Sequence, residues 1–429
     1  MDSDLSPTTE QGLEQFLQKL RPHLTDKRQV ASFATYVMGL LSPLERKSLE
    51  PIATLRTPCP HHASAAHQRL QHFGTDSGWP DAPIRQEAVQ QALVPMLHHG
   101  PIQVSVIDDT AHLKKGEHSV GVSRQYAGCV GKVANCQITP TLVVANEHAH
   151  LPVDISLYLP RAWTDDPLRR KEARIPDSVG FKTKPELALQ MIDTAQQQGI
   201  PLGVMTADAA YGNSAEFRSQ LRRRGLPYLL AVQGSTRVQC WDPQRGLLSP
   251  QSAASLGEPL LAKDFAIYTV PGLPKPRLAR LAFRQVVVPS DGPMRQWLLI
   301  EWRPQEKQPL RYYVSNLPPS TRRRRLVQLL KARWHTEPAY QEMKGELGMD
   351  HYEGRRWRGF HHHMTVVMCC YAFVIAQRER SFSPCAAALQ SGGAQLGASR
   401  TTRQEQLRLL APAGRQGRAL YAGPLRPAA

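Results

Sequence analysis

The chain has 429 residues, which is long enough for a large hydrophobic core and for two or three domains. Its 53 lysines and arginines against 36 aspartates and glutamates give a formal net charge of +17. This charge favours a polyanionic partner, nucleic acid first and an anionic membrane surface second, with an ordinary soluble basic protein as the alternative. The seven cysteines contain no CxxC pair, which argues against a zinc site and predicts a reduced, cytoplasmic protein.

No segment is predicted to span a membrane, and no membrane partner is expected. The longest apolar run, Met364 to Ala376, is too short for a bilayer and predicts a buried helix. The polar, acidic start of the chain, MDSDLSPTTE, is not typical of a signal peptide.

Residues 1–95 predict a helical N-terminal domain for binding DNA ends. Ser6 and Pro7 suit a helix start, and Ser42 to Glu45 predicts the start of a third helix. Between them, apolar residues recur at helical spacing in two runs: Leu13, Phe16, Leu17 and Leu20, then Val30, Phe33, Val37 and Leu40. Residues 57–83 are expected to be a loop. The same pattern also suits an ordinary helical domain, and no recognition helix can be named.

From Pro101 onward the pattern predicts alternating strands and helices, hence an α/β fold. Strands are expected at 102–107, 119–126, 136–145, 153–159, 203–207 and 228–232. A capping box at Thr183 to Glu186 opens one helix, and a second is expected at 214–224. We therefore assign residues 100–232 to the first part of a catalytic core.

A β-rich segment interrupts this order at residues 233–310. Strands are expected at 265–270, 281–288 and 297–302, with a turn at 289–293. A strand at 311–315 and the final helices then complete the core to residue 378. Residues 379–429, rich in Ala, Gly, Arg, Gln and Pro, are expected to be disordered.

Acidic residues stand at positions where ligands collect in α/β sheets. Asp108 and Asp109 are expected at the end of the first core strand, Asp208 at the end of a later strand, and Glu337 on a helix. Three converging carboxylates can hold two Mg²⁺ ions for an in-line phosphoryl transfer. Each aspartate alone is typical of a turn or cap, so the prediction rests on their joint placement.

The stretch from Arg333 to His363 carries the third acid. On a continuous helix Arg333, Glu337 and Lys344 would lie toward one face. Alone, this stretch is more typical of a solvated charged helix. Pro338 either kinks that helix or begins it, and in the second case Arg333 leaves the shared face.

Several stretches together carry a family resemblance. They are VIDDTAHLKKGEHSVGVSRQYAG, LYLPRAWTDDP, FKTKPELALQMID, VMTADAAYG and RWHTEPAYQEMKGELGMDHYEGRRWRGFHHH. The chain resembles bacterial insertion-sequence transposases of the DDE superfamily, most similar to the insertion sequence 701 family, over about residues 78–378. The resemblance implies an RNase H-like core with a β-rich insertion before its last core helices.

The resemblance also implies roles for individual residues. The first catalytic acid is Asp108 or Asp109, with the form Asp-x-Thr favouring Asp108, and the second and third are Asp208 and Glu337. Asp108, Asp208 and Glu337 are then the ligands of two Mg²⁺ or Mn²⁺ ions. Related transposases share the pattern YxxRxxxExxxxxxK. Arg333, Glu337 and Lys344 fit it, but Leu330 stands at the tyrosine position; Tyr340 is a candidate substitute.

Basic residues around these acids are candidates for DNA contacts. They are Arg333, Lys344, Arg322, Arg323, Arg324, Arg325, Lys114, Lys115 and Lys132. For Lys114, Lys115 and Lys132, a solvated surface is an equal alternative. Among the tryptophans of the insertion (Trp241, Trp297 and Trp302), a base-stacking role is implied by the resemblance, but a sheet core is favoured for Trp297 and Trp302. His361, His362 and His363 point apart on a helix, so we expect DNA-facing or packing roles instead of a shared metal ion.

The predicted function is a transposase that binds terminal inverted repeats, cleaves the ends and joins the 3′ hydroxyl to target DNA. We expect a bacterial, nucleoid-associated protein that acts as a homodimer. Two alternatives are a related nuclease and a domesticated, inactive DNA-binding protein, although the intact acidic triad argues against loss of catalysis. A non-enzymatic basic scaffold is the third.

Overall fold

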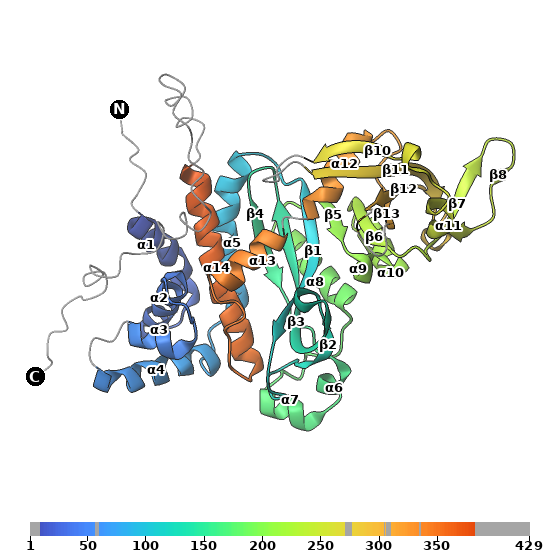
Figure 1. The fold of residues 1–429 in the computed structure, drawn as a ribbon. Helices are drawn as coiled ribbons and strands as arrows, with labels where there is room; N and C mark the ends of the chain where they lie inside the picture. Colours follow the sequence, from blue (N-terminus) through green and yellow to red (C-terminus); the bar gives the residue numbers. More distant parts are fainter. Residues whose placement is uncertain are drawn as a thin grey trace, which may run out of the picture. The chain divides into compact units, whose positions relative to one another are not determined.

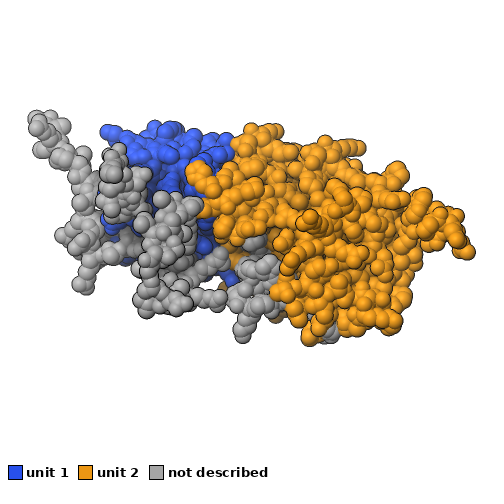
Figure 2. Space-filling view, turned by 90° about the horizontal axis from the view of Figure 1, so that it is seen from above, with its two compact units in different colours: residues 1–96, 341–429 blue, residues 97–340 orange. Residues whose placement is uncertain are grey.

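The structure is a computed structural model that describes residues 9–55, 60–270, 277–303, 305, 310–333 and 336–381. The described residues form two compact units (Figure 2). One contains the chain up to Met96 together with the part from Gln341 on, and the other runs from Leu97 to Tyr340. The five-part division predicted from the sequence stays a prediction, and most of its proposed tail lies outside the described residues.

The first unit is helical (Figure 1). Its helices are α1 (Thr9–Leu20), α2 (Lys27–Leu41), α3 (Leu49–Leu55), α4 (Pro60–Thr75), α5 (Asp81–His98) and α14 (Trp357–Ser381). Aromatic contacts join the early helices to α14. Phe16 meets Phe373 edge-on with ring centroids 5.5 Å apart, and Trp79 stacks on His362 at 3.7 Å. Burying these apolar faces against one another is what stabilises such a group of helices.

Two expectations for this unit are wrong. Ser42 does not start a helix: it closes α2, and its hydroxyl donates to the Gly39 carbonyl. Lys47 then donates to the carbonyls of Leu40 and Ser42, which satisfies the end of α2 before α3 begins at Leu49. The loop expected at 57–83 is mostly helical, since α4 and the start of α5 lie there; residues 57–59 lie outside the described residues. The proposed Ser6–Pro7 helix start lies outside the described residues.

The apolar run of α14 is a buried helix, as predicted. α14 is long and apolar enough to cross a membrane, but 94% of its most apolar window is buried inside the protein. The same test is met by core helices of soluble proteins. His362 and His363 are buried, and each ring donates a hydrogen bond to a backbone carbonyl, so their packing role is confirmed.

The second unit is built on one mixed sheet (Figure 1). Its strands are β1 (Val104–Leu113), β2 (Ser123–Ala127), β3 (Lys132–Ala145), β4 (His150–Ile155), β5 (Val204–Ala207), β6 (Tyr228–Val232), β7 (Arg237–Asp242), β8 (Gly246–Leu247), β9 (Gln251–Ser252), β10 (Ala266–Val270), β11 (Arg277–Val287), β12 (Arg295–Trp302) and β13 (Leu310–Ser315). The main order is β2-β3-β1-β5-β6-β13-β12-β11-β7-β8. β1 pairs antiparallel with β3 and parallel with β5, and β5 pairs parallel with β6. This mixed α/β arrangement is consistent with the predicted RNase H-like fold.

The helices of this unit are α6 (Arg161–Thr164), α7 (Pro167–Ala173), α8 (Lys184–Gln197), α9 (Ala209–Gly212), α10 (Ala215–Arg223), α11 (Ala253–Gly257), α12 (Arg323–Ala332) and the first half of α13 (Thr336–Gly345). The capping box of α8 is confirmed. The Thr183 hydroxyl accepts from the Glu186 amide, and the Glu186 carboxylate accepts from the Thr183 amide. One hydrophobic cluster joins α12 to the sheet. Leu326 and Leu330 pack there with Val106, Leu229 and residues of β11 and β12.

Asp108 and Asp109 do not lie at a strand end, which corrects the sequence-based expectation. β1 continues to Leu113, because its antiparallel ladder with β3 extends through Asp108 opposite Thr141. The parallel neighbour β5 does end nearby, at Ala207 opposite Ile107. Asp208 therefore follows a strand end directly beside the strand that carries Asp108.

A buried ion pair ties α10 to the turn between β11 and β12. Arg218 donates to both carboxylate oxygens of Asp291, and the two side chains are 2% and 0% exposed. Tyr228 and Gln296 also donate to that carboxylate. These bonds satisfy the buried charge of Asp291, which would otherwise be costly to remove from water.

Candidate active site

The Asp108 carboxylate is held from both sides. The Asp109 amide donates to its Oδ1 at 3.0 Å. Arg333 donates to its Oδ2 at 2.9 Å, and the Thr336 hydroxyl donates to the same oxygen at 3.0 Å. A side chain held by this many partners has little rotational freedom. Asp108 is therefore fixed before any ligand arrives.

Burial raises the pKa of Asp108 to about 6, while the Arg333 guanidinium lowers it and the Asp208 charge raises it. Burial and then the charge of Asp109 also raise the pKa of Asp208. Asp208 caps α9, with its Oδ1 accepting from the Ala210 amide at 2.9 Å. Two neighbouring carboxylates that resist ionisation are typical of a functional site.

Asp109 has different partners from Asp108. Lys184, the first residue of α8, lies with its Nζ 2.5 Å from Asp109 Oδ2. The Tyr211 hydroxyl donates to Asp109 Oδ1. Successive residues of a strand point to opposite faces, which explains the separation. Lys184 and Tyr211 were missed by sequence reasoning; the signal for Tyr211 is its position three residues after Asp208 in TADAAYG.

Arg333 and Glu337 do not share one helix, which corrects the same-face expectation. α12 ends at Ala332 with Arg333 as its C-cap, and α13 begins at Thr336. Pro338 is the third residue of α13, where its missing amide costs nothing, and its ring would clash with a helix continuing from the preceding turn. Arg333 still reaches the site, through the end of α12, and Glu337 lies exposed in the first turn of α13.

Two hydroxyl groups near Glu337 reach Asp108. Besides Thr336, the Tyr340 hydroxyl donates to the Asp108 carbonyl at 3.1 Å and lies 2.8 Å from Thr141 Oγ1. Leu330, which stands where related transposases have tyrosine, is buried in the core cluster with α12. Thr336 was also missed from the sequence, because a threonine at a helix start is common.

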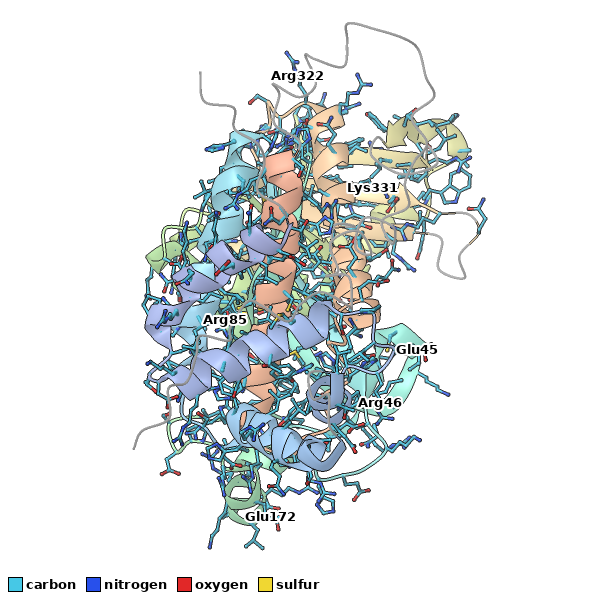
Figure 3. The ribbon with its side chains drawn as sticks, turned by 90° about the vertical axis from the view of Figure 1, so that its left-hand side faces the viewer. Glu45, Arg46, Arg85, Glu172, Arg322 and Lys331 are labelled. Carbon is cyan, nitrogen blue, oxygen red and sulfur yellow. The ribbon has the colours of Figure 1, made fainter. Side chains whose placement is uncertain are left out.

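The remaining predicted residues lie at scattered points. Arg322 and Arg323 to Arg325 form the N-cap and first turn of α12, whose start and end Figure 3 marks with Arg322 and Lys331. Lys115 and Lys132 are exposed and Lys114 is half-buried, and all three lie beside β1 and β3. Lys344 is half-buried in the last turn of α13. Trp297 is in the sheet core, as favoured, whereas Trp241 is 53% exposed.

Asp108 and Asp208 fit a divalent cation in their donor chemistry. Carboxylate oxygens are the ligands that Mg²⁺ and Mn²⁺ prefer, and a cation would offset both the burial and the carboxylate repulsion that raise the two pKa values. Glu337 is not gathered with them: across residues 9–381, outside the gaps noted above, no three His, Cys, Asp or Glu side chains form a group that could hold a metal. The described site thus supplies two of the three predicted ligands.

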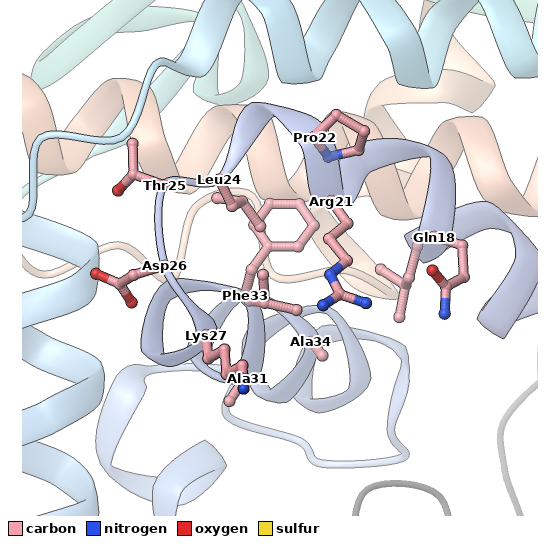
Figure 4. A pocket seen from close by; sticks show the side chains of 12 residues that line it. Gln18, Arg21, Pro22, Leu24, Thr25, Asp26, Lys27, Ala31, Phe33 and Ala34 are labelled. Atoms are coloured by element: carbon pink, nitrogen blue, oxygen red, sulfur yellow. The ribbon is translucent and has the colours of Figure 1, made fainter.

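A pocket of about 760 Å³ lies in the helical unit (Figure 4). It is lined by α1, α2 and the turn between them, including Arg21, Leu24, Lys27 and Phe33. None of the predicted site residues lines it. Its walls carry no cluster of acids, so it does not account for the chemistry of the aspartates.

Comparison with known proteins decides the family. The DDE superfamily endonuclease family matches residues 19–305, more than half of the chain. The chain belongs to the DDE superfamily endonucleases. The predicted resemblance to the DDE superfamily is therefore confirmed, and the match includes Asp108, Asp109 and Asp208, while Glu337 lies beyond its end.

One protein similar to this DDE endonuclease is named as a transposase. The chain is 28% identical over 228 residues to the "Probable transposase for insertion sequence element IS701" of Microchaete diplosiphon. The match covers 53% of this chain and 55% of the relative, so the chain spans about half the length of that protein. The predicted similarity to the insertion sequence 701 family is confirmed as a similarity.

The raised pKa of Asp108 gives this DDE endonuclease a testable pH dependence. A folded-state pKa of about 6, above the ordinary 3.8, means that the protonated carboxyl favours the metal-free fold below pH 4. That contribution, about 3 kcal/mol, is lost as the pH rises through 6. Urea unfolding at pH 4 and pH 7 should show Asp108→Asn gaining about 2.4 kcal/mol relative to the wild type, since the unfolded carboxyl is already partly ionised at pH 4. A pH-independent difference would contradict the raised pKa.

Proposed function

We propose that the chain is a DNA transposase whose chemical centre is formed by Asp108, Asp208 and Glu337. The observation that carries the proposal is the placement of Asp108 beside Asp208 at the end of β5, both half-buried and both with a pKa that burial raises. This pair of aspartates occurs in a chain that belongs to the DDE superfamily endonucleases. The similarity to a protein named as a probable transposase supports the transposase class.

In this proposal Asp108, not Asp109, is the first catalytic acid. Both oxygens of Asp109 are bonded to Lys184 and Tyr211. Asp108 faces the end of α12 and the start of α13, where Arg333 and Thr336 hold it. Glu337 directly follows Thr336, so its backbone is close to the carboxylate that Thr336 contacts.

Asp108 and Asp208, with Glu337, would hold Mg²⁺ or Mn²⁺, two ions in the full site. The metal would activate the attacking oxygen and stabilise the leaving oxygen of phosphoryl transfer. Asp108 and Asp208 enter that step deprotonated. Arg333, about one-third exposed beside Asp108, is placed to pair with a DNA phosphate as well.

DNA is the proposed substrate, as terminal inverted repeats and as target. The formal charge of +17 supports a polyanionic partner. Arg322, Arg323 and Arg324 at the start of α12 are proposed backbone contacts, and Arg325 also donates to Gln103. Lys114, Lys115 and Lys344 complete the proposed set. We expect a homodimer to hold two ends, in the nucleoid of a bacterial cell.

The test is cleavage of DNA that carries the sequences flanking the gene, with Mg²⁺. Glu337→Gln should reduce end cleavage at least about a hundredfold, because a lost carboxylate ligand removes charge stabilisation worth several kcal/mol. Binding of the ends in a gel-shift assay should persist. Glu216→Gln is the matched control, since Glu216 is an exposed glutamate in the first turn of α10. Wild-type cleavage by Glu337→Gln would remove Glu337 from the site.

A related nuclease without strand transfer is the second candidate. The family description, an endonuclease, favours it as much as a transposase. Joining of a precut end to a plasmid target separates the two. Cleavage without any joined product would favour the nuclease.

A further inference from the structure

Asp109 stands next to a proposed metal ligand, but its contacts suit another task. We propose that Asp109 is a positioning residue, which fixes the turn that carries Asp208 through the Tyr211 hydroxyl and whose charge Lys184 balances. This inference rests on the proposed function, because it concerns the geometry of the same site. It assigns roles to Tyr211 and Lys184 that the sequence motifs did not indicate.

Asp108 and Asp109, neighbours on β1, make different contacts. The backbone amide of Asp109 donates to Asp108 Oδ1, while its side chain points to Lys184 and Tyr211. Both side-chain oxygens of Asp109 accept from these two partners. To bind a metal ion, the Asp109 carboxylate would have to give up its bonds to Lys184 and Tyr211.

Two contacts hold α9, the short helix that follows Asp208, in place. This helix has four residues, begins at the Asp208 cap and contains Tyr211 and Gly212. A helix so short cannot fix its own position, because it contains almost no complete helical hydrogen bonds. Gly212 packs on β6: a Cβ there would lie 1.9 Å from the Ala231 carbonyl oxygen. Tyr211, which is 0% exposed, supplies the second anchor, to β1.

Lys184 balances the negative charge of Asp109. The carboxylates of Asp109 and Asp208 are close enough for their charges to repel each other. Lys184 offsets part of that repulsion, because its Nζ lies 2.5 Å from Asp109 Oδ2. The same Nζ lies 5.7 Å from the centroid of the Tyr158 ring. Because Lys184 opens α8 in a capping box, its backbone is well fixed. Asp109 thus links three elements, α8, α9 and β1, around Asp208.

Direct metal binding tests this without relying on turnover. Electron paramagnetic resonance of free Mn²⁺ gives the dissociation constant of the full-length protein for this ion. The variants are Tyr211→Phe, Asp109→Asn and Asp208→Asn. Tyr228→Phe is the matched control, because Tyr228 is equally buried and its hydroxyl bonds to Gln296 and Asp291. Circular dichroism checks that each variant is folded.

Tyr211→Phe should weaken Mn²⁺ binding about tenfold, since losing a group that orients a ligand typically costs 10- to 100-fold. Asp109→Asn keeps an oxygen acceptor for Tyr211, so its loss should stay within about tenfold. Asp208→Asn should abolish binding, and Tyr228→Phe should leave it unchanged. Unchanged binding by Tyr211→Phe, or loss in Asp109→Asn as complete as in Asp208→Asn, would overturn the positioning role. Unchanged binding by Asp208→Asn would instead overturn the proposed metal site.

Discussion

Replacing Asp208 with asparagine is expected to abolish cleavage of DNA ends while leaving the fold intact. The proposed site loses one carboxylate ligand, and a loss of about 4 kcal/mol of transition-state stabilisation corresponds to a rate at least about a thousandfold lower. The fold should tolerate the change for two reasons. Asparagine caps helices as well as aspartate, so the bond from Ala210 to the side chain persists. The substitution also removes the repulsion with Asp108 and Asp109.

Asp166→Asn is the matched control for this experiment. Asp166 caps α7 in the same way and is about two-fifths exposed, and its carboxylate accepts from the amides of Leu168 and Arg169. Cleavage by the control should equal that of the wild type, measured as the rate of nicking of a labelled end with Mg²⁺. End binding should be the same in all three proteins. Nicking by Asp208→Asn at the wild-type rate would contradict the assignment of the chemical centre.

Replacing Arg218 with methionine should have the largest effect on stability. The change leaves the Asp291 carboxylate buried without its main cationic partner, and breaking a buried pair in this way costs about 3–5 kcal/mol. The guanidinium of Arg222, 3.5 Å from the Asp291 carboxylate, offsets only part of this loss of stability. Arg218 also donates to the Gly212 carbonyl, so the turn after Asp208 loses a bond.

Arg224→Met serves as the comparison, because Arg224 pairs with the partly exposed Asp193 and such pairs contribute about 0–1 kcal/mol. Thermal unfolding followed by circular dichroism should show a clearly lower midpoint for Arg218→Met than for Arg224→Met. Adding Asp291→Asn to Arg218→Met should recover part of the loss, since the unpaired charge is then removed. Equal midpoints for the two single variants would mean that the buried pair contributes little.

Local patterns predicted much of the second unit. β6 matches its predicted range, and the capping box of α8 is present because its two hydrogen bonds involve residues only three positions apart. The prediction that Asp208 follows a strand end is confirmed, and the parallel pairing of β1 with β5 brings it beside Asp108.

Other features depend on contacts that sequence spacing does not record. The antiparallel partner β3 extends β1 past Asp109, so a pattern that reads Asp108 and Asp109 as a strand end is wrong. Pro338 admitted two interpretations, and the structure takes the one in which a new helix begins. Most of the loop expected at 57–83 is helical, over 60–75 and from 81 on, because α4 and α5 bury Phe73 and Ile84 in the unit, which polar composition conceals.

Gly212 shows that a position in a short motif can be constrained by space alone, without taking part in the chemistry. In TADAAYG the aspartate brings charge and the tyrosine a hydroxyl, but the glycine brings only the absence of a side chain. Any larger residue at 212 would meet the Ala231 carbonyl and push α9 away from β6. Mutational tolerance at this position should therefore be as narrow as at Asp208 itself, and a survey of substitutions alone would mistake a steric limit for a catalytic one.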